Sequence, residues 1–253
     1  MNEPSALDRI PQGLDELQRL LKRLDYDAAR READRAKAVF TAKGDKLGEA
    51  WCRYYHAVIA FDLGAYTLAE EESRASIGEF EALGNHPGQA WALCNLQRAL
   101  CSQGKAELSR EPGVQALALF DQLGNKDGAP VAQRWLAVAA RRLGRYDESR
   151  AELLVAMRAF AEAGRTQRLL ECVHDWSWLE IAAGHPAEAL RLQHYLIRHS
   201  QSPRWAVINV MSSVGKLEAQ PERLPEFEGS VEGLVNYLLQ GGPAPVSAPV
   251  GNT

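Results

Sequence analysis

The chain has 253 residues, of which 46% are hydrophobic and 25% are charged, a balance typical of a folded protein and not of a disordered one. Its formal net charge of −4 gives no general attraction to nucleic acid or to an anionic membrane, because either would require a basic excess, so neither is expected as a partner. The N-terminus is charged throughout, and no run approaches the roughly 18 apolar residues of a membrane span, so we expect a cytoplasmic protein.

The first part of the chain is expected to hold an N-terminal extension and one helical hairpin. The extension covers residues 1–9, and the hairpin uses residues 14–40, which are rich in the helix formers Ala, Leu, Arg and Glu. Apolar residues recur here three and four positions apart, as on one face of an amphipathic helix. The apolar stripe of the first helix is expected to consist of Leu14, Leu17, Leu21 and Leu24.

Glycine then recurs at every twentieth position, without an insertion or a deletion. The segments between these glycines have helical composition and spacing, and each predicts a helix of about 16 residues. A glycine just past a helix end can adopt the left-handed conformation that ends the helix. Asp45, Asn85 and Asn125 follow alternate glycines and can cap the next helix. The glycines are Gly44, Gly64, Gly84, Gly104, Gly124, Gly144, Gly164 and Gly184.

The full repeat is therefore forty residues long and consists of two helices and two turns. Residues of matching size recur at this interval, as expected when large and small side chains of neighbouring hairpins interdigitate. The large positions are Phe40, Phe80, Phe120 and Phe160, and Tyr26, Tyr66 and Tyr146; the small ones are Ala69, Ser109, Ser149 and Ala189.

The segments "LGAYTLAEEESRASI" (63–77) and "LGRYDESRAELLVAM" (143–157) resemble the turn and second helix of a tetratricopeptide repeat, or TPR. The resemblance covers residues 10–200 and implies five hairpins in an all-α, right-handed α-solenoid of antiparallel helical hairpins. The forty-residue period resembles the long variety found in bacterial regulatory and signalling proteins. Two features depart from the family: Arg53 and Gln133 replace its large residue early in the first helix, and a Gly-Asn-x-x-Gly loop replaces its closing proline.

Two further features are expected in the second half of the hairpin array and beyond it. Glu111, Pro112 and Gly113 interrupt a predicted helix, which should be kinked or broken because proline removes a hydrogen bond and clashes with the preceding turn. The twenty-residue register ends after Ser200. Residues 201–240 are expected to form capping helices, and residues 241–253, rich in Pro, Gly and Ala, a flexible tail.

The sequence contains no recognisable apparatus for catalysis, so no catalytic residue, metal site or cofactor is predicted. Metalloprotease, nucleophile-elbow, phosphate-loop and dinucleotide-binding motifs are all missing. The four cysteines lie inside helical patterns without a C-x-x-C spacing, so reduced, mostly buried thiols are expected. His56 is expected in the core, and His174 in the wall of a groove.

Binding residues are instead sought on the first helices of the hairpins, which line the inner face of such a solenoid. Side chains forty residues apart should stack in ladders there, and aromatic rings beside arginines can hold an extended peptide. Asn95 matches the asparagine of the family's carboxylate clamp, but the clamp's lysines have no counterparts. The candidates are Tyr54, Tyr55, Trp91, Asn95, Arg98, Arg134, Trp135, Arg141, Arg142, His174 and Trp178.

The leading functional hypothesis is a non-catalytic scaffold or adaptor that binds an acidic, partly apolar peptide or helix in this groove. The occupant could also be the chain's own residues 222–239, which are acidic and apolar. Alternatives are a sensory input module of a bacterial regulator and, third, an all-helical enzyme. Replacing Arg98 and Arg134 by alanine is expected to weaken binding while leaving the melting temperature nearly unchanged.

Overall fold

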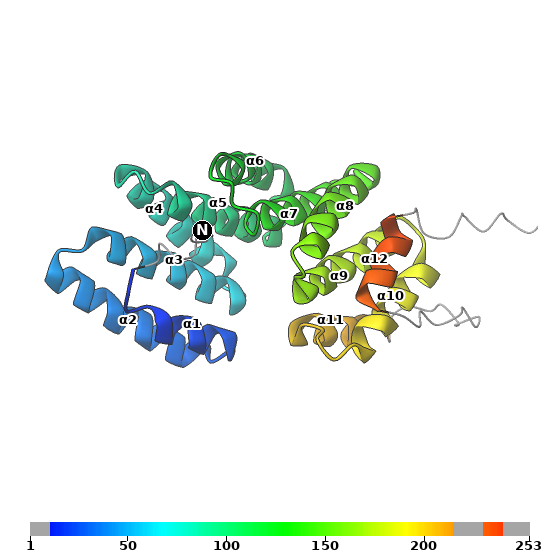
Figure 1. Ribbon diagram of the computed structural model, residues 1–253, viewed down its shortest axis with the longest axis horizontal. Helices are drawn as coiled ribbons and strands as arrows, with labels where there is room; N and C mark the ends of the chain where they lie inside the picture. The colour runs from blue at the N-terminus through cyan, green and yellow to red at the C-terminus, as the bar shows by residue number, and fades with distance from the viewer. Residues whose placement is uncertain (1–10, 215–229, 240–253) are drawn as a thin grey trace, which may run out of the picture. The chain divides into compact units, whose positions relative to one another are not determined.

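The computed structural model describes residues 11–214 and 230–239, and the regular structure of these residues is entirely helical (Figure 1). The chain divides into two compact units, residues 1–149 and 150–253. Helix α8 (Tyr146–Glu162) runs across this division. The first unit contains α1 (Asp15–Lys22), α2 (Tyr26–Lys43), α3 (Lys46–Asp62), α4 (Tyr66–Ala82), α5 (His86–Ser102), α6 (Ala106–Gln122) and α7 (Ala129–Arg142). The second contains α9 (Thr166–Ala182), α10 (Pro186–Arg198), α11 (Arg204–Val214) and α12 (Val231–Leu239).

The turns between helices are built on the twenty-residue glycines, as the sequence predicts. All eight glycines from Gly44 to Gly184 have positive φ angles, between 62° and 86°. The turn at Gly84 shows the pattern: the Asn85 N–H donates to the Phe80 carbonyl at 2.8 Å, and the Gly84 N–H donates to the Glu81 carbonyl at 3.0 Å. These two bonds satisfy carbonyls that the helix end leaves open, and the left-handed residue between them makes the reversal possible.

Leu24 occupies the same position in the first turn, twenty residues before Gly44. Its φ is 60°, and it makes the same bonds, from its own N–H to Leu21 and from the Asp25 N–H to Leu20. The expectation that Leu24 belongs to the apolar stripe of the first helix is wrong, because α1 ends before it and its side chain is 47% exposed. Leu14 and Leu17 of that stripe are buried.

The predicted caps are present at the starts of α3 and α5 and in the loop that leads to α7. Asp45, Asn85 and Asn125 each accept a hydrogen bond from a backbone N–H three residues later, at 2.8 to 2.9 Å. In each case the donor is a glycine, and these donors are Gly48, Gly88 and Gly128. The Asn or Asp of the repeated motif therefore stabilises the start of a helix, where the first backbone N–H groups have no acceptor within the helix.

The second glycine of the motif makes room for the phenylalanine that precedes the turn. The Phe80 ring is fully buried between two helices, edge to face with Trp51 of α3 at 5.0 Å and directly against the backbone of Gly88 in α5. A Cβ on Gly88 would overlap this ring. The same contact recurs for Phe40 on Gly48 and for Phe120 on Gly128, with Trp91 in the role of Trp51 at Phe120. We call this contact the ring–glycine contact.

The fourth copy of the motif, in the second unit, departs from the other three. Phe160 is again buried, and Gly164 again has a positive φ. However, Arg165 replaces the capping residue and makes no side-chain cap, and Arg168 stands where the other copies have glycine.

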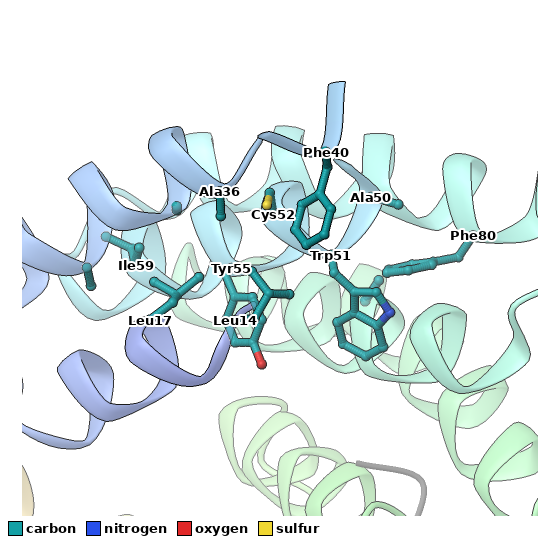
Figure 2. Close-up of a cluster of buried hydrophobic side chains, with 13 residues drawn as sticks. Leu14, Leu17, Ala36, Phe40, Ala50, Trp51, Cys52, Tyr55, Ile59 and Phe80 are labelled. Atoms are coloured by element: carbon teal, nitrogen blue, oxygen red, sulfur yellow. The ribbon is translucent and has the colours of Figure 1, made fainter. Parts of the chain in front are cut away.

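The core of the first hairpins is a continuous layer of side chains from α1, α2, α3 and α4 (Figure 2). Leu14, directly before α1, and Leu17 of α1 lie over Tyr55 and Ile59 of α3. The aromatic residues Phe40, Trp51 and Phe80 follow along the same layer. The small positions Ala69, Ser109, Ser149 and Ala189 are all buried, as the forty-residue pattern predicts. None of the described helices is long and apolar enough to cross a membrane.

Helix α6 is not broken at Pro112, so the break that the sequence suggested as one of two outcomes does not occur. It continues from Ala106 to Gln122 with Pro112 inside it. The reason lies in the neighbouring residue: Gly113 is buried so tightly against Gln97 of α5 and Leu136 of α7 that a Cβ would overlap both. Burial of Ser109, Ala116 and Phe120 on the same helix adds to this packing. The tertiary contacts of α6 therefore outweigh the local penalty of the proline.

We predict that Gly88→Ala lowers the free energy of unfolding by about 1–3 kcal/mol, because the new methyl group overlaps the Phe80 ring. Gly78→Ala is the matched control. Gly78 lies in α4 with nothing near its missing Cβ, so this change should raise the free energy of unfolding by about 0.5–1 kcal/mol. Urea denaturation of both variants checks the pair, and equal effects would contradict the ring–glycine contact.

We predict that Pro112→Ala stabilises the protein by up to about 3 kcal/mol, because it restores a helix hydrogen bond without changing the helix path. Gly113→Ala should have the opposite effect, since its methyl group overlaps Gln97. Thermal unfolding followed by circular dichroism measures both. A destabilised Pro112→Ala variant would mean that the proline is required for the path of α6.

Candidate protein-interaction face

The first helices of the hairpins form an inner layer in the first unit. Helix α3 contacts α5, and α5 contacts α7, in addition to the contacts that each makes with its hairpin partner. Contacts along this layer join residues 37 positions apart, as in the hydrogen bond from Gln18 Nε2 to Tyr55 Oη at 2.8 Å. We call the partly exposed side of α3, α5 and α7 the inner face.

Arg98 is the centre of a cluster on the inner face. Its guanidinium carbon lies 4.0 Å from the centroid of the Phe61 ring and 5.8 Å from that of Trp135. Its Nη1 donates to Asn95 Oδ1 at 3.1 Å, and its Nη2 lies 3.5 Å from Asp62 Oδ1. The Phe61 and Trp135 rings meet edge to face at 6.0 Å. The cluster thus joins α3, α5 and α7 through one cation and two rings.

Asp62 and Phe61 are not among the candidate residues that the forty-residue ladders predict for this face. The positive charge of Arg98 is matched by Asp62 on the preceding inner helix. Burial, and then the negative charge of Asp62, raise the pKa of Tyr26, which stands close to this pair. Phe61, Arg98 and Trp135 follow one another at intervals of 37 residues. A search at this interval would have found the cluster, whereas a ladder of forty residues does not contain all three.

The two tyrosines of α3 have different roles. Tyr55 is buried and its hydroxyl accepts from Gln18; burial raises its pKa to about 12. It is therefore a core residue and not an accessible groove residue (Figure 2). Tyr54 is half-buried and packs edge to face on Trp51 at 5.2 Å and on Tyr55 at 5.1 Å. Of the pair, Tyr54 is the one that can contact a partner.

Helix α5 carries two N–H donors that have no acceptor among the described residues, Trp91 Nε1 and Asn95 Nδ2. They are four positions apart and so lie on one side of the helix, two turns and one turn before Arg98. Asn95 is buried, and its Oδ1 is taken by Arg98, which fixes the amide with its Nδ2 in the other direction. Trp91 is half-buried against the Phe120 ring at 4.9 Å.

The remaining arginines of the first unit differ in exposure. Arg134 is 5% exposed, and its guanidinium carbon lies 5.4 Å from the centroid of the Trp135 ring. Its burial corrects the expectation that it is an accessible groove cation. Arg141 is half-buried in the last turn of α7, and Arg142 beside it is exposed. Trp135 itself is half-buried.

His174 and Trp178 form a separate cluster in the second unit. The Trp178 Nε1–H donates to His174 Nε2 at 3.0 Å, which leaves the proton of a neutral imidazole on Nδ1, 3.4 Å from Asp175 Oδ1. The ring of Trp205, from α11, meets the His174 ring edge to face at 4.9 Å. His174 is buried and Trp178 half-buried, so only the second is accessible.

The described residues contain no group of His, Cys, Asp and Glu that could hold a metal ion. All four cysteines are buried thiols outside any disulfide, as the sequence predicts. Burial raises the pKa of Cys52 to about 12, so this thiol is a poor nucleophile. Burial also lowers the pKa of His56, which is half-buried and lies 3.2 Å from Asp34.

The chain was compared with protein families and with solved structures. No family model and no curated protein matches the sequence. Two solved structures of a kinesin light chain-like protein with nearly identical TPR-like repeats, from Podosopora anserina, are similar in fold. One has a TM-score of 0.54 at 15% identity, covering 85% of this chain and 100% of the other. The second has a TM-score of 0.53 at 17% identity, with 85% and 99% covered.

At these identities the likeness concerns the fold alone. Together with the packing of consecutive helices, it defines the class of this protein: an all-α solenoid built from TPR-like helical hairpins.

We predict that Arg98→Ala lowers the free energy of unfolding by about 1–3 kcal/mol, because it leaves the buried Asn95 Oδ1 without its donor and removes the ion pair with Asp62. This reverses the expectation, made from sequence, of an unchanged melting temperature. Arg142→Ala is the matched control at an exposed position and should change stability by less than about 0.5 kcal/mol. Chemical denaturation of the two variants checks the difference, and a silent Arg98→Ala would contradict it.

Proposed function

We propose that this chain is a non-catalytic interaction scaffold that binds an extended, partly apolar and acidic protein segment on the inner face of its first unit. The TPR-like fold supports the general class, because stacked hairpins present their first helices along one continuous surface. The partner and the binding mode are inferred from the residues on that surface.

The observation that carries the proposal is the set of half-buried aromatic residues on three consecutive inner helices. Tyr54 lies on α3, Trp91 on α5 and Trp135 on α7. Each ring offers a large contact area with few rotatable bonds to fix, which is why Trp and Tyr dominate the energetics of peptide recognition. Trp91 Nε1 and Asn95 Nδ2, which have no acceptor among the described residues, lie beneath this surface. If one of these side chains turned outward, its N–H would donate to a carbonyl or carboxylate oxygen of a ligand.

The charge of the inner face limits how much an acidic partner gains from it. Arg98 already pairs with Asp62, and Arg134 is buried, so the apolar contacts are expected to supply most of the affinity. Acidic side chains of the partner would add a smaller contribution. That contribution should weaken with salt, because the Debye length falls from about 10 Å at 0.1 M to about 3 Å at 1 M.

The sequence suggested that residues 222–239 of the chain itself occupy the groove. Residues 222–229 lie outside the described part of the structure. The described remainder is α12, which contacts α9 in its own unit. Its Tyr237 hydroxyl accepts a hydrogen bond from Arg191 of α10 at 3.3 Å. We therefore propose a segment of another protein as the occupant.

We predict that Trp135→Leu weakens the binding of peptides selected by the wild-type chain by about 30-fold, the effect of losing a hot-spot tryptophan. The peptides come from an array of 12-residue sequences that combine Asp or Glu with aromatic and aliphatic residues. Leucine keeps the position apolar, and the melting temperature of each variant shows that the fold is retained. Leu108→Ser, at an exposed position on α6 outside the inner face, should bind like the wild type.

Two results would contradict this function. If Trp135→Leu and Tyr54→Ala bind every selected peptide as the wild type does, the inner face of the first unit is not the binding surface. If the array yields only basic or purely polar peptides, the proposed partner chemistry is wrong.

A further inference from the structure

Helix α11 exposes a stripe of three large apolar side chains in the second unit. Trp205, Ile208 and Met211 are three residues apart and are 40%, 58% and 63% exposed. Residues at this spacing lie along one side of a helix. We call them the α11 stripe. Each residue is large, and the three together offer roughly 300 Å² of apolar surface, at the size where an exposed patch on a monomer is often functional.

Packing on the opposite side of α11 holds the α11 stripe in place. Ala206 and Val210, on the opposite side of α11, are fully buried, and the helix packs against α10. The Trp205 ring also rests on the buried His174 ring, which receives the hydrogen bond from Trp178. The stripe is therefore a fixed surface feature that requires no rearrangement to meet a partner.

The described residues that precede and form α11 carry positive charge only, although the whole chain has a net charge of −4. Among the described residues after Glu188, none up to Val214 is Asp or Glu, whereas Arg198 and Arg204 are exposed at the two sides of the turn before α11. Through the His174 ring, Trp205 is linked to Asp175 of α9, which is buried. The local charge thus complements an acidic partner.

We propose that the α11 stripe is a second interaction surface, which docks one amphipathic helix of a partner protein with acidic residues flanking its apolar side. Apolar residues spaced at i and i+3 on one helix form a ridge that fits the groove between such rows on another helix. A partner helix with apolar residues at i, i+3 or i+4, and i+7 supplies that groove, and its Asp or Glu residues meet Arg198 and Arg204. This surface is separate from the inner face of the first unit and does not depend on the function proposed for it.

Two other occupants fit the observations less well. A second copy of the chain would need about 800 Å² from each partner for a stable interface, more than twice what the α11 stripe offers. An anionic membrane surface is typically bound by clusters of about four to eight Lys or Arg residues. Only two arginines border the stripe. The area and the charge both match a single helix bound reversibly.

The test is a selection from a phage-displayed library of 18-residue helical peptides on the full-length chain, with counter-selection on the Ile208→Ser variant. Ile208 is more than half exposed, so serine at this position should leave the fold intact. We expect clones with an apolar side flanked by Asp and Glu. For a selected peptide, fluorescence anisotropy should show an about tenfold loss of affinity for Ile208→Ser and for Met211→Ser, the loss of one buried aliphatic contact.

Leu108→Ser is the matched control, because Leu108 is an equally exposed aliphatic residue, 64% exposed, on α6 of the first unit. It should leave the affinity unchanged. Arg204→Glu should weaken binding and reduce its dependence on salt, because it reverses a charge at the rim. Trp135→Leu should have no effect on this peptide, which separates the result from the inner face.

Several outcomes would overturn the proposal. One is a library that yields no clone dependent on Ile208, or only clones without acidic residues. Another is self-association in sedimentation velocity that Ile208→Ser abolishes, which would assign the stripe to a second copy. Binding to anionic vesicles that is lost in Ile208→Ser, with no peptide selected, would assign it to a membrane. The last is a gain of peptide affinity of at least tenfold when a Gly-Ser linker replaces residues 215–229. This gain would assign the α11 stripe to the chain's own segment.

Discussion

The contact of a phenylalanine ring with the backbone of a glycine in the next hairpin is the constraint on which the stacking of the first unit depends. Phe80 can lie against α5 only because Gly88 has no side chain, and Asn85 holds the start of α5 at the height where that glycine meets the ring. The left-handed turn at Gly84 sets the direction in which the chain enters α5. Cap, turn and ring therefore act together, and a change at any one of them displaces the other two. This coupling explains why the motif recurs as a unit at an interval of forty residues.

The same stacking determines which residues remain accessible. Because α3, α5 and α7 contact one another, most of their ladder positions become core, and Tyr55, Asn95 and Arg134 are buried. What stays partly exposed is an aromatic surface around Arg98, whose charge is already matched by Asp62, with Arg141 and Arg142 at the end of α7. For the function proposed above, such a surface favours recognition by shape and apolar area, and charge adds specificity.

Helix positions, turns and caps could be predicted from the sequence because they depend on local chemistry: a glycine twenty residues after another, and an Asn or Asp directly after it. Two elements could not. Leu24 adopts a left-handed conformation because the turn bonds around it are satisfied, which residue type alone does not indicate. Helix α6 passes through Pro112 because Gly113 packs on Gln97, a contact across helices that the local pattern cannot contain. In the site, the forty-residue ladder named Arg98 and Trp135 but not Asp62 or Phe61, because side chains of adjacent inner helices meet on a diagonal.

The altered fourth copy of the motif bears on how the array comes apart. In a stack where each hairpin touches only its neighbours, the stability of the whole is close to a sum of hairpin and junction contributions, so the weakest junction decides where cooperativity ends. The junction between α8 and α9 lacks both the capping side chain and the glycine that the three earlier junctions have, with Arg165 and Arg168 in their places. Under mechanical load or partial denaturation, the hairpins after α8 would then separate from those before it as one block, leaving the three locked junctions intact. The chain would then unfold in two stages.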